Sequence, residues 1–315
     1  METFEVIRPG PMATVQDLGR SGYQQYGVPA SGAMDGYAYR IGNLLVGNDE
    51  GAPSLEITLF GCRLRLRHDA TVAITGADLA PALNGNPVPM WETFSVKKSD
   101  TLTFPRLKSG CRAYLAVAGG IDVPKVMGSA STYTRAGIGG FQGRPLRAGD
   151  IIHTGQPAGS PRPARVPPEH IPTYVNQLEL RVILGPQDDY FTEEGIRTFL
   201  SSTYTVSAQA DRMGYRLDGP RIQHQAKADI ISDGIPLGAV QVPGDGLPII
   251  LLADRQTTGG YTKIATVISP DIYRLAQAKP GDTVTFRRIG EDEALKARHD
   301  SEQGIRRLAS LCRID

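Results

Sequence analysis

Two stretches decide the fold: "KKSDTLTF" (Lys97–Phe104) and "KPGDTVTF" (Lys279–Phe286), which share the pattern Asp-Thr-x-Thr-Phe. A second related pair lies upstream of them. "RSGYQQYG" (Arg20–Gly27) and "RMGYRLDG" (Arg212–Gly219) share Arg-x-Gly-Tyr-x3-Gly. The arginine precedes the aspartate by 80 residues in the first half and by 70 in the second. Two ordered matches at similar separation predict a duplicated unit of about domain size.

A proline-rich segment separates the two copies. "QPAGSPRPARVPPEHIP" (Gln156–Pro172) holds six prolines in 17 residues. Because proline removes backbone donors and favours extended structure, this segment is typical of a stiff linker. We therefore expect a first domain over 1–156, a linker over 157–174, a second domain over 175–290 and a C-terminal helical tail over 291–315.

Short runs of Val, Ile, Leu and Thr, separated by many of the 36 glycines and 23 prolines, predict a mainly β protein with few short helices. The clearest strand candidates are Leu55–Leu59, Arg63–Arg67, Thr71–Thr75, Thr101–Phe104, Ala113–Ala118, Leu178–Leu184, Ile249–Ala253 and Thr283–Arg287. One helix is predicted after Asp35 as its N-cap, and another after Ser269 as its cap with Pro270 in the first turn.

Bulk composition excludes several classes of partner. A net charge of +1 gives no reason to expect nucleic acid or an anionic membrane. No apolar run approaches the roughly 20 residues that span a bilayer, and "METFEVIRPG" does not resemble a secretory signal. Cys62, Cys111 and Cys312 lie far apart, which is typical of a reduced, cytoplasmic protein.

Several kinds of site leave no trace in the sequence. There is no P-loop, no histidine or cysteine pairing that indicates a metal site, and no Met-Lys-Met stretch for a biotinyl lysine. Polar residues instead follow the ends of apolar runs in both halves. This placement predicts that equivalent loops of two related domains line a site.

The most polar of these loops lies within "LLADRQTTGGYTKIATVIS" (Leu251–Ser269). Gly259 and Gly260 between two apolar runs are typical of a hairpin turn, because both accept positive φ. The same glycines, with Arg255 beside them, would also suit a backbone nest that binds a carboxylate or phosphate. Two interpretations stay open for other polar residues. Asp17 and Asp35 are either site residues or helix caps, and Arg20 and Arg212 either bind a ligand or bind loop carbonyls.

Long motifs carry a family resemblance from Val6 to about Arg288. They include "TVQDLGRSGYQQYGVPASGAMDGYAYRIGNLLVGND", "AYLAVAGGID" and "GAVQVPGDGLPIILLADRQTTGGY". The chain resembles the allophanate hydrolase subunit 2 family, also called the biotin-dependent carboxyltransferase family, which includes the C subunit of 5-oxoprolinase. The resemblance implies two tandem cyclophilin-like β-barrels.

The resemblance also implies a function and partners. The expected activity is the ATP-dependent opening of 5-oxo-L-proline to L-glutamate. The implied partners are a protein like allophanate hydrolase subunit 1 (KipI-like, the B subunit of 5-oxoprolinase) and a LamB/YcsF-like protein (the A subunit), with ATP at a shared site. Two alternatives stay open: a carboxyltransferase subunit of a urea or amide carboxylase, with biotin on another chain, and a non-catalytic antagonist that binds a KipI-like kinase inhibitor.

Such a site needs arginines and backbone N–H groups that hold a carboxylate and a phosphoryl oxygen. As catalytic residues we expect Arg255, Gln256 and Lys263, with Tyr261 orienting them and Asp17 or Asp245 transferring a proton. As substrate-binding residues we expect Arg20, Asp35, Arg212, Gln241, Thr257, Thr258, Gly259 and Gly260. No metal ligand is expected.

Overall fold

The computed structural model describes residues 1–311, so Cys312 and the end of the expected tail (312–315) lie outside the described residues. The chain divides into two compact units. Unit 1 comprises residues 1–20, 31–174 and the chain from Gln303; unit 2 comprises 21–30 and 175–302. This division differs from the expected bounds, because unit 2 takes residues 21–30 and the C-terminal helix is divided between the units.

Unit 1 is built from two sheets, in agreement with the mainly β prediction. Its strands are β1 (Glu2–Pro9), β2 (Met12–Gln16), β3 (Ser54–Thr58), β4 (Cys62–Leu66), β5 (Ala70–Asp78), β6 (Ala82–Leu83), β7 (Asn86–Pro87), β8 (Thr93–Val96), β9 (Thr101–Thr103), β10 (Ser109–Val117) and β11 (Ile151–His153). One sheet has the order β11-β1-β4-β9-β6-β7 and the other β2-β3-β10-β5-β8. Apolar side chains that alternate along these strands, such as Leu64, Leu66 and Leu102, form the buried core.

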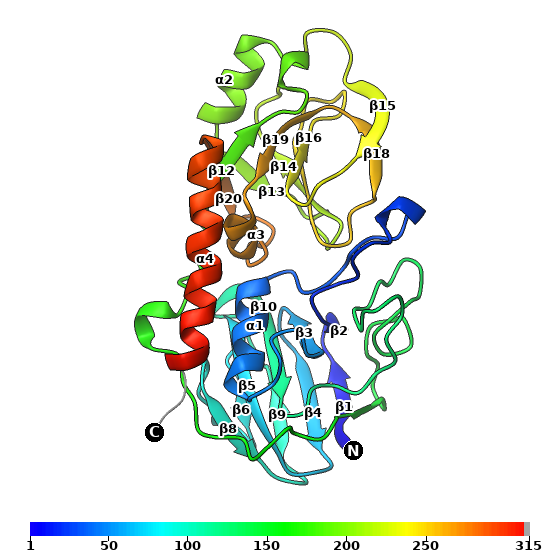
Figure 1. Cartoon of the computed structure of the whole chain (residues 1–315), viewed down its shortest axis with the longest axis vertical. Coiled ribbons are helices and arrows are strands. Elements are labelled where there is room, and N and C mark those ends of the chain that lie inside the picture. Colours follow the sequence, from blue (N-terminus) through cyan, green and yellow to red (C-terminus); the bar gives the residue numbers. More distant parts are fainter. Residues whose placement is uncertain (312–315) are drawn as a thin grey trace. The chain divides into compact units, whose positions relative to one another are not determined.

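Unit 2 is a closed barrel with a two-stranded ribbon beside it (Figure 1). Its strands are β12 (Gln177–Leu184), β13 (Tyr204–Val206), β14 (Gly214–Asp218), β15 (Asp229–Gly234), β16 (Ala239–Gln241), β17 (Ile249–Leu251), β18 (Thr258–Tyr261), β19 (Lys263–Val267) and β20 (Thr283–Arg288). The barrel order is β12-β19-β16-β17-β14-β13-β20, and β20 closes it by pairing with both β12 and β13. β15 and β18 pair only with each other among the described strands.

The helices are α1 (Gly36–Leu45), α2 (Glu193–Ser201), α3 (Ser269–Leu275) and α4 (Glu291–Leu311), with short 3-10 turns η1 (Gln24–Tyr26), η2 (Pro168–His170) and η3 (Asp188–Tyr190). α1 packs on β5 and β10 (Figure 1). Asp35 caps α1 as predicted, since its Oδ1 accepts the Ala38 N–H at 2.9 Å. The Ser269 cap is wrong by one residue, because Ile268 is the N-cap of α3 and Ser269 already lies inside the helix.

The repeated Asp-Thr-x-Thr-Phe stretches begin with the same turn. Asp100 N donates to Lys97 O at 3.0 Å, and Asp100 Oδ2 accepts Lys97 N at 2.7 Å. Asp282 and Lys279 repeat this arrangement at 3.0 Å in both bonds. The third turn residue has φ of 76° at Ser99 and 93° at Gly281, as a type II turn requires. We call this arrangement the aspartate-closed turn.

A third aspartate-closed turn, which the sequence comparison did not reveal, spans 147–150 and precedes β11. Asp150 N donates to Arg147 O at 3.1 Å, and Asp150 Oδ2 accepts Arg147 N at 2.7 Å. The upstream repeat pair is different. Residues 20–27 form a loop and η1, whereas Gly214–Asp218 form strand β14, so this pair has no common structure.

The proline-rich segment packs against unit 1 and does not stand apart as a linker. Ala164 N donates to Thr93 Oγ1 at 2.9 Å, and Val166 N donates to Trp91 O at 2.8 Å. Ala164 and Val166 are both buried. The prolines supply extended backbone, while the small apolar residues between them supply burial and N–H donors.

The stability of the third aspartate-closed turn should depend on pH. Arg144 donates to both carboxylate oxygens of Asp150, at 2.7 and 2.9 Å. Burial by itself raises the pKa of Asp150, but the hydrogen bonds from Arg144 and Arg147 outweigh it and hold the pKa below its ordinary value. A carboxyl with a lowered folded-state pKa stabilises the fold at neutral pH, and this contribution is lost as pH falls through that pKa.

We therefore expect Asp150→Asn to lower the free energy of unfolding by about 1.5–3 kcal/mol at neutral pH, with a smaller difference below about pH 4. Urea titrations across this pH range measure the difference. Asp100→Asn is the matched control, because the same turn there has no arginine pair and should lose less. A difference that stays constant with pH contradicts the assigned role of the Asp150 carboxylate.

Candidate functional site

A buried lysine in the barrel of unit 2 is the centre of the candidate site. Lys263 begins β19, and its side chain is only 1% exposed. Its ammonium donates to Oδ1 of Asp233 on β15, whose side chain is 41% exposed. Gln187 joins both residues, since its Nε2 donates to Asp233 Oδ2 at 3.2 Å and its Oε1 accepts Lys263 N at 3.1 Å. The result is a fixed cation whose one carboxylate partner is open to solvent.

The two glycines of the polar loop lie in a strand and not in a turn. Gly259 and Gly260 belong to β18, and Gly259 pairs with Asp233 of β15. Neither glycine has a positive φ. The predicted hairpin turn at Gly259-Gly260 is therefore wrong, and so is the backbone nest, because a nest requires left-handed residues.

Close packing explains why position 259 is a glycine. A Cβ atom there would lie 2.6 Å from Ile235 Cδ1, 2.9 Å from Gln241 Nε2 and 3.5 Å from Gln256 Nε2. Contacts below 3 Å require a neighbour to move, and here the ends of the buried Ile235 and Gln241 side chains would have to shift. Gly259 therefore brings the amides of Gln241 and Gln256 to one point beside the β15–β18 ribbon, close to the partner strand that holds Asp233.

A second cation, Arg255, is fixed next to this ribbon. Its Nε donates to Ile235 O at 2.9 Å and its Nη1 to Leu252 O at 3.2 Å. The residue is 7% exposed, and no carboxylate among residues 1–311 pairs with it. Burial lowers the pKa of Arg255 to about 10, with no acidic group that offsets the effect. The guanidinium thus stays protonated at neutral pH and adds an unbalanced positive charge.

One short segment anchors both cations. The Asp233 carboxylate binds Lys263, and the Ile235 carbonyl two residues later binds Arg255. The same segment is tied to the polar loop, because Ile235 N donates to Thr257 O at 3.0 Å and Gly234 pairs with Thr258. This segment therefore gathers most of the predicted residues of unit 2 around it: Arg255, Gln256, Thr257, Thr258, Gly259, Gln241 and Lys263. Gly260 and Tyr261 follow in β18.

Two predicted residues of unit 2 have other surroundings. Arg212 donates to both oxygens of Asp254, at 2.9 and 3.1 Å, and its backbone carbonyl accepts the Asp254 N–H at 2.9 Å. This pair holds the residue that precedes Arg255, so Arg212 acts on the loop and is not an open anion site. Asp245 is exposed and accepts Leu247 N at 3.0 Å in a turn of its own, which gives it no contact with Lys263 or Arg255.

The predicted residues of unit 1 have structural partners. The Asp17 carboxylate accepts hydrogen bonds from Gly19 N, Ser129 Oγ, Ala130 N and Ser131 Oγ. Oδ1 accepts three of these bonds and Oδ2 accepts one, so the carboxylate holds the surrounding loop together, which argues against proton transfer by Asp17. Arg20 Nη2 donates to Ser131 O at 2.6 Å and helps to hold the same loop.

Asp35 is also a structural residue. Besides capping α1 it accepts the Tyr174 hydroxyl at 3.2 Å, and its own N–H donates to the Tyr114 hydroxyl at 2.8 Å. The alternatives left open for Asp35 as a cap and for Arg20 as a carbonyl-binding arginine therefore describe their contacts better than substrate binding does.

Two residues of the site, Asp233 and Gln187, were missed by sequence reasoning. Asp233 lies in "ADIISDGIPLG", which has no clear strand alternation, and Gln187 follows β12 in a short polar connection. Both reach Lys263 across long sequence separations. Only the pairing of β15 with β18 and the position of η3 beside β19 reveal them.

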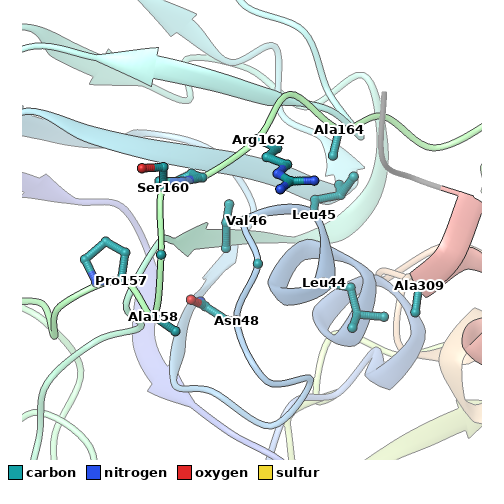
Figure 2. Close-up of a pocket in the computed structure, with 13 residues that line it drawn as sticks. Leu44, Leu45, Val46, Asn48, Pro157, Ala158, Ser160, Arg162, Ala164 and Ala309 are labelled. Atoms are coloured by element: carbon teal, nitrogen blue, oxygen red, sulfur yellow. The ribbon is translucent and has the colours of Figure 1, made fainter. Parts of the chain in front are cut away.

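Two pockets lie in unit 1, and Gly139, which lines the second, lies beside the Arg20 side chain. Figure 2 shows a pocket of about 320 Å³ at the end of α1, lined by the proline-rich segment and by Ala309 of α4. Another, of about 440 Å³, is lined by Asp122 and the glycine-rich segment 137–143. Within residues 1–311 no cluster of three or more His, Cys, Asp or Glu side chains suits a metal ion. No helix of that part of the chain has the length and apolar character to cross a membrane.

Comparison with known proteins gives close relatives. A family model described as "Carboxyltransferase domain, subdomain A and B" matches residues 26–288. The C subunit of 5-oxoprolinase from Escherichia coli (strain K12) is 41% identical over 306 residues, which cover 97% of this chain and 97% of the relative. The Haemophilus influenzae protein of the same name is 37% identical, with 95% of each chain covered.

Larger proteins contain a similar region. Urea amidolyase of Saccharomyces cerevisiae is 34% identical over 99% of this chain, which corresponds to 18% of that protein. The crystal structure of Kluyveromyces lactis urea carboxylase matches with a TM-score of 0.93 and 32% identity, over 100% of this chain and 30% of the other.

The close approach at Gly259 can be tested by a single methyl group. Gly259→Ala should lower the free energy of unfolding by about 1–3 kcal/mol and shift the side-chain amide signals of Gln241 and Gln256 in an NMR spectrum. Gly234→Ala in the partner strand β15 is the matched control, because its Cβ atom would meet no heavy atom within 4 Å. Both substitutions restrict the unfolded chain to the same extent, so equal stability of the two would rule out the proposed packing.

Proposed function

Because the chain belongs to the carboxyltransferase domain family (subdomains A and B), as its motifs predict, we propose that it is a subunit of an ATP-dependent 5-oxoprolinase. Together with its partner proteins it opens the lactam of 5-oxo-L-proline to give L-glutamate. The observation that carries this proposal is the match along nearly the whole length of two proteins named as the C subunit of 5-oxoprolinase, at 41% and 37% identity.

The reaction needs an activated amide. The lactam oxygen attacks the γ-phosphorus of ATP, and ADP leaves. Water then adds to the ring carbon, the C–N bond breaks to give an acyl phosphate and a free amine, and a second water releases phosphate and L-glutamate. Negative charge develops on oxygen in each step, so fixed cations in a water-poor site favour the reaction.

Lys263 supplies such a cation for the reacting oxygen, and Arg255 supplies a second fixed charge in the same site. Together they carry two positive charges, against one carboxylate from Asp233. Lys263 is held by short-range contacts with Asp233 and Gln187 and therefore needs little reorganisation when an oxyanion forms. The amides of Gln241 and Gln256 beside Gly259 add neutral hydrogen-bonding groups.

This chain has few features that are typical of a nucleotide-binding site. It contains no P-loop motif, and the glycines of the polar loop are extended. We propose that the ATP site is completed by the partners, one like allophanate hydrolase subunit 1 (KipI-like) and one LamB/YcsF-like. Both close relatives are named as one subunit of 5-oxoprolinase, which supports an enzyme of several different chains.

Carboxyl transfer from biotin to a urea-like amide is a second candidate function. The similarity to urea amidolyase and urea carboxylase favours it, and biotin would then be carried by another chain. The 5-oxoprolinase proposal is better supported, because the chain covers 97% of its relative there but only 18% of the urea amidolyase.

Reconstitution tests the proposal. The purified chain should be folded but inert, and 5-oxo-L-proline should stimulate ATP hydrolysis only after the chain is mixed with both partners. Phosphate release measures this, with each protein alone as a control. Lactam-stimulated hydrolysis by this chain alone contradicts the shared site. A tight complex with the KipI-like partner and no turnover of any lactam or amide indicates an antagonist instead.

The role of Lys263 can be tested in the same complex. Lys263→Met should lower kcat by about 100- to 1,000-fold, because a preorganised cation next to the developing charge is removed. The exposed Asp233 is then solvated by water, so the fold should persist. Lys108→Met, which removes an exposed lysine paired with Asp78 at 3.2 Å in unit 1, is the control and should keep the wild-type rate. Equal rates for both variants contradict the role of Lys263.

A further inference from the structure

Arg255 carries a charge that the fold does not balance. A buried cation without a counter-ion is strongly unfavourable, so buried charges are ordinarily paired. The other buried arginine in this region, Arg212, follows that rule through its fork with Asp254. Arg255 binds two neutral carbonyls, and no described carboxylate lies within ion-pair distance of it. The contrast indicates that an anion from outside the chain completes the charge at Arg255.

The geometry leaves part of the guanidinium available. A guanidinium has five N–H groups in a planar fork. Nε–H and one Nη1–H are donated to Ile235 O and Leu252 O, and Nη2 donates to no residue among those described. The two carbonyl bonds fix the plane of the group. Its remaining N–H groups are therefore preorganised for a planar, bidentate acceptor.

We propose that Arg255 binds the carboxylate of the substrate and selects carboxylate-bearing lactams over neutral ones. This inference rests on the proposed 5-oxoprolinase function and assigns the specificity of its site. One unbalanced positive charge matches the single charge of a carboxylate. A nucleotide phosphate carries more charge and needs several donors, for which left-handed glycines or a helix N-terminus are the usual source. At Gly259 and Gly260 the glycines are extended and do not supply them.

The positions of Lys263 and Arg255 suit contacts with two different groups of one substrate. Arg255 and Lys263 are both anchored on residues 233–235, through Ile235 O and the Asp233 carboxylate. Asp233 and Ile235 are two residues apart, so both cations are held by one short segment of chain. Arg255 therefore holds the carboxylate end, and Lys263 serves the lactam oxygen. A neutral amide leaves the buried guanidinium unpaired and is rejected for that reason.

The test compares two substrates in the reconstituted complex of this chain with both partner proteins. 5-Oxo-L-proline and 2-pyrrolidinone share the lactam ring and differ by the carboxylate. For the wild type we expect kcat/KM to be at least about 1,000-fold higher for 5-oxo-L-proline. Arg255→Gln should lower kcat/KM for 5-oxo-L-proline by about 100-fold or more and leave that for 2-pyrrolidinone nearly unchanged.

Two further variants keep the test decisive. Arg255→Lys retains a charge that can bind the two carbonyls, so it should fold even if Arg255→Gln does not, and should show a smaller loss of selectivity. Arg216→Gln, which replaces an exposed arginine on β14 of the same barrel, should retain wild-type selectivity. Urea titration confirms that each variant is folded.

The outcomes distinguish a wrong role for Arg255 from a wrong 5-oxoprolinase function. If Arg255→Gln and Arg255→Lys lower kcat/KM equally for both substrates, Arg255 does not read the carboxylate and the inference is wrong, while the 5-oxoprolinase function stands. If the wild-type complex turns over neither lactam, the proposed function is wrong and the inference is wrong with it.

Discussion

A hydrogen bond from the backbone N–H of one residue to the carboxylate of an aspartate three residues later is the interaction on which the strand framework depends. It forms at Asp100, Asp150 and Asp282, directly before β9, β11 and β20. The bond fixes a type II turn and so sets where the next strand begins. For β20 the consequence is largest, because this strand pairs with both β12 and β13 and closes the barrel. A closed barrel has no free edge, which leaves its loops and the adjoining ribbon for chemistry.

The candidate site contains two buried cations that have different kinds of partner. Lys263 projects from a barrel strand and finds Asp233 on the ribbon, whereas Arg255 finds backbone carbonyls only. Arg212, nearby in the chain, has its own carboxylate in Asp254. Arg212 and the proposed substrate-binding residue Arg255 thus differ in the chemistry of their partners and not in burial, since both are buried.

Local patterns predicted eight of the 20 described strands and helix α1, because burial of alternate residues and a capping aspartate are visible in short windows of sequence. Features that depend on packing were not predictable. Gly259-Gly260 resembles a turn, but the glycines serve close contact with Gln241 and Ile235. Asp233 and Gln187 were missed because they reach Lys263 only through tertiary pairing. Of the two repeats, the one with a turn mechanism has a common structure in both units, whereas the other is a loop in one unit and a strand in the other.

The chain crosses between the two units several times, and this limits where it can be cut into two complete units. It does so at residues 20–21, 30–31, 174–175 and 302–303, so neither unit is a continuous piece of sequence. A cut in the proline-rich segment would leave the C-terminal fragment without residues 21–30 of unit 2, and the N-terminal fragment without the part of α4 that belongs to unit 1. A gene split at that place would therefore encode two incomplete bodies.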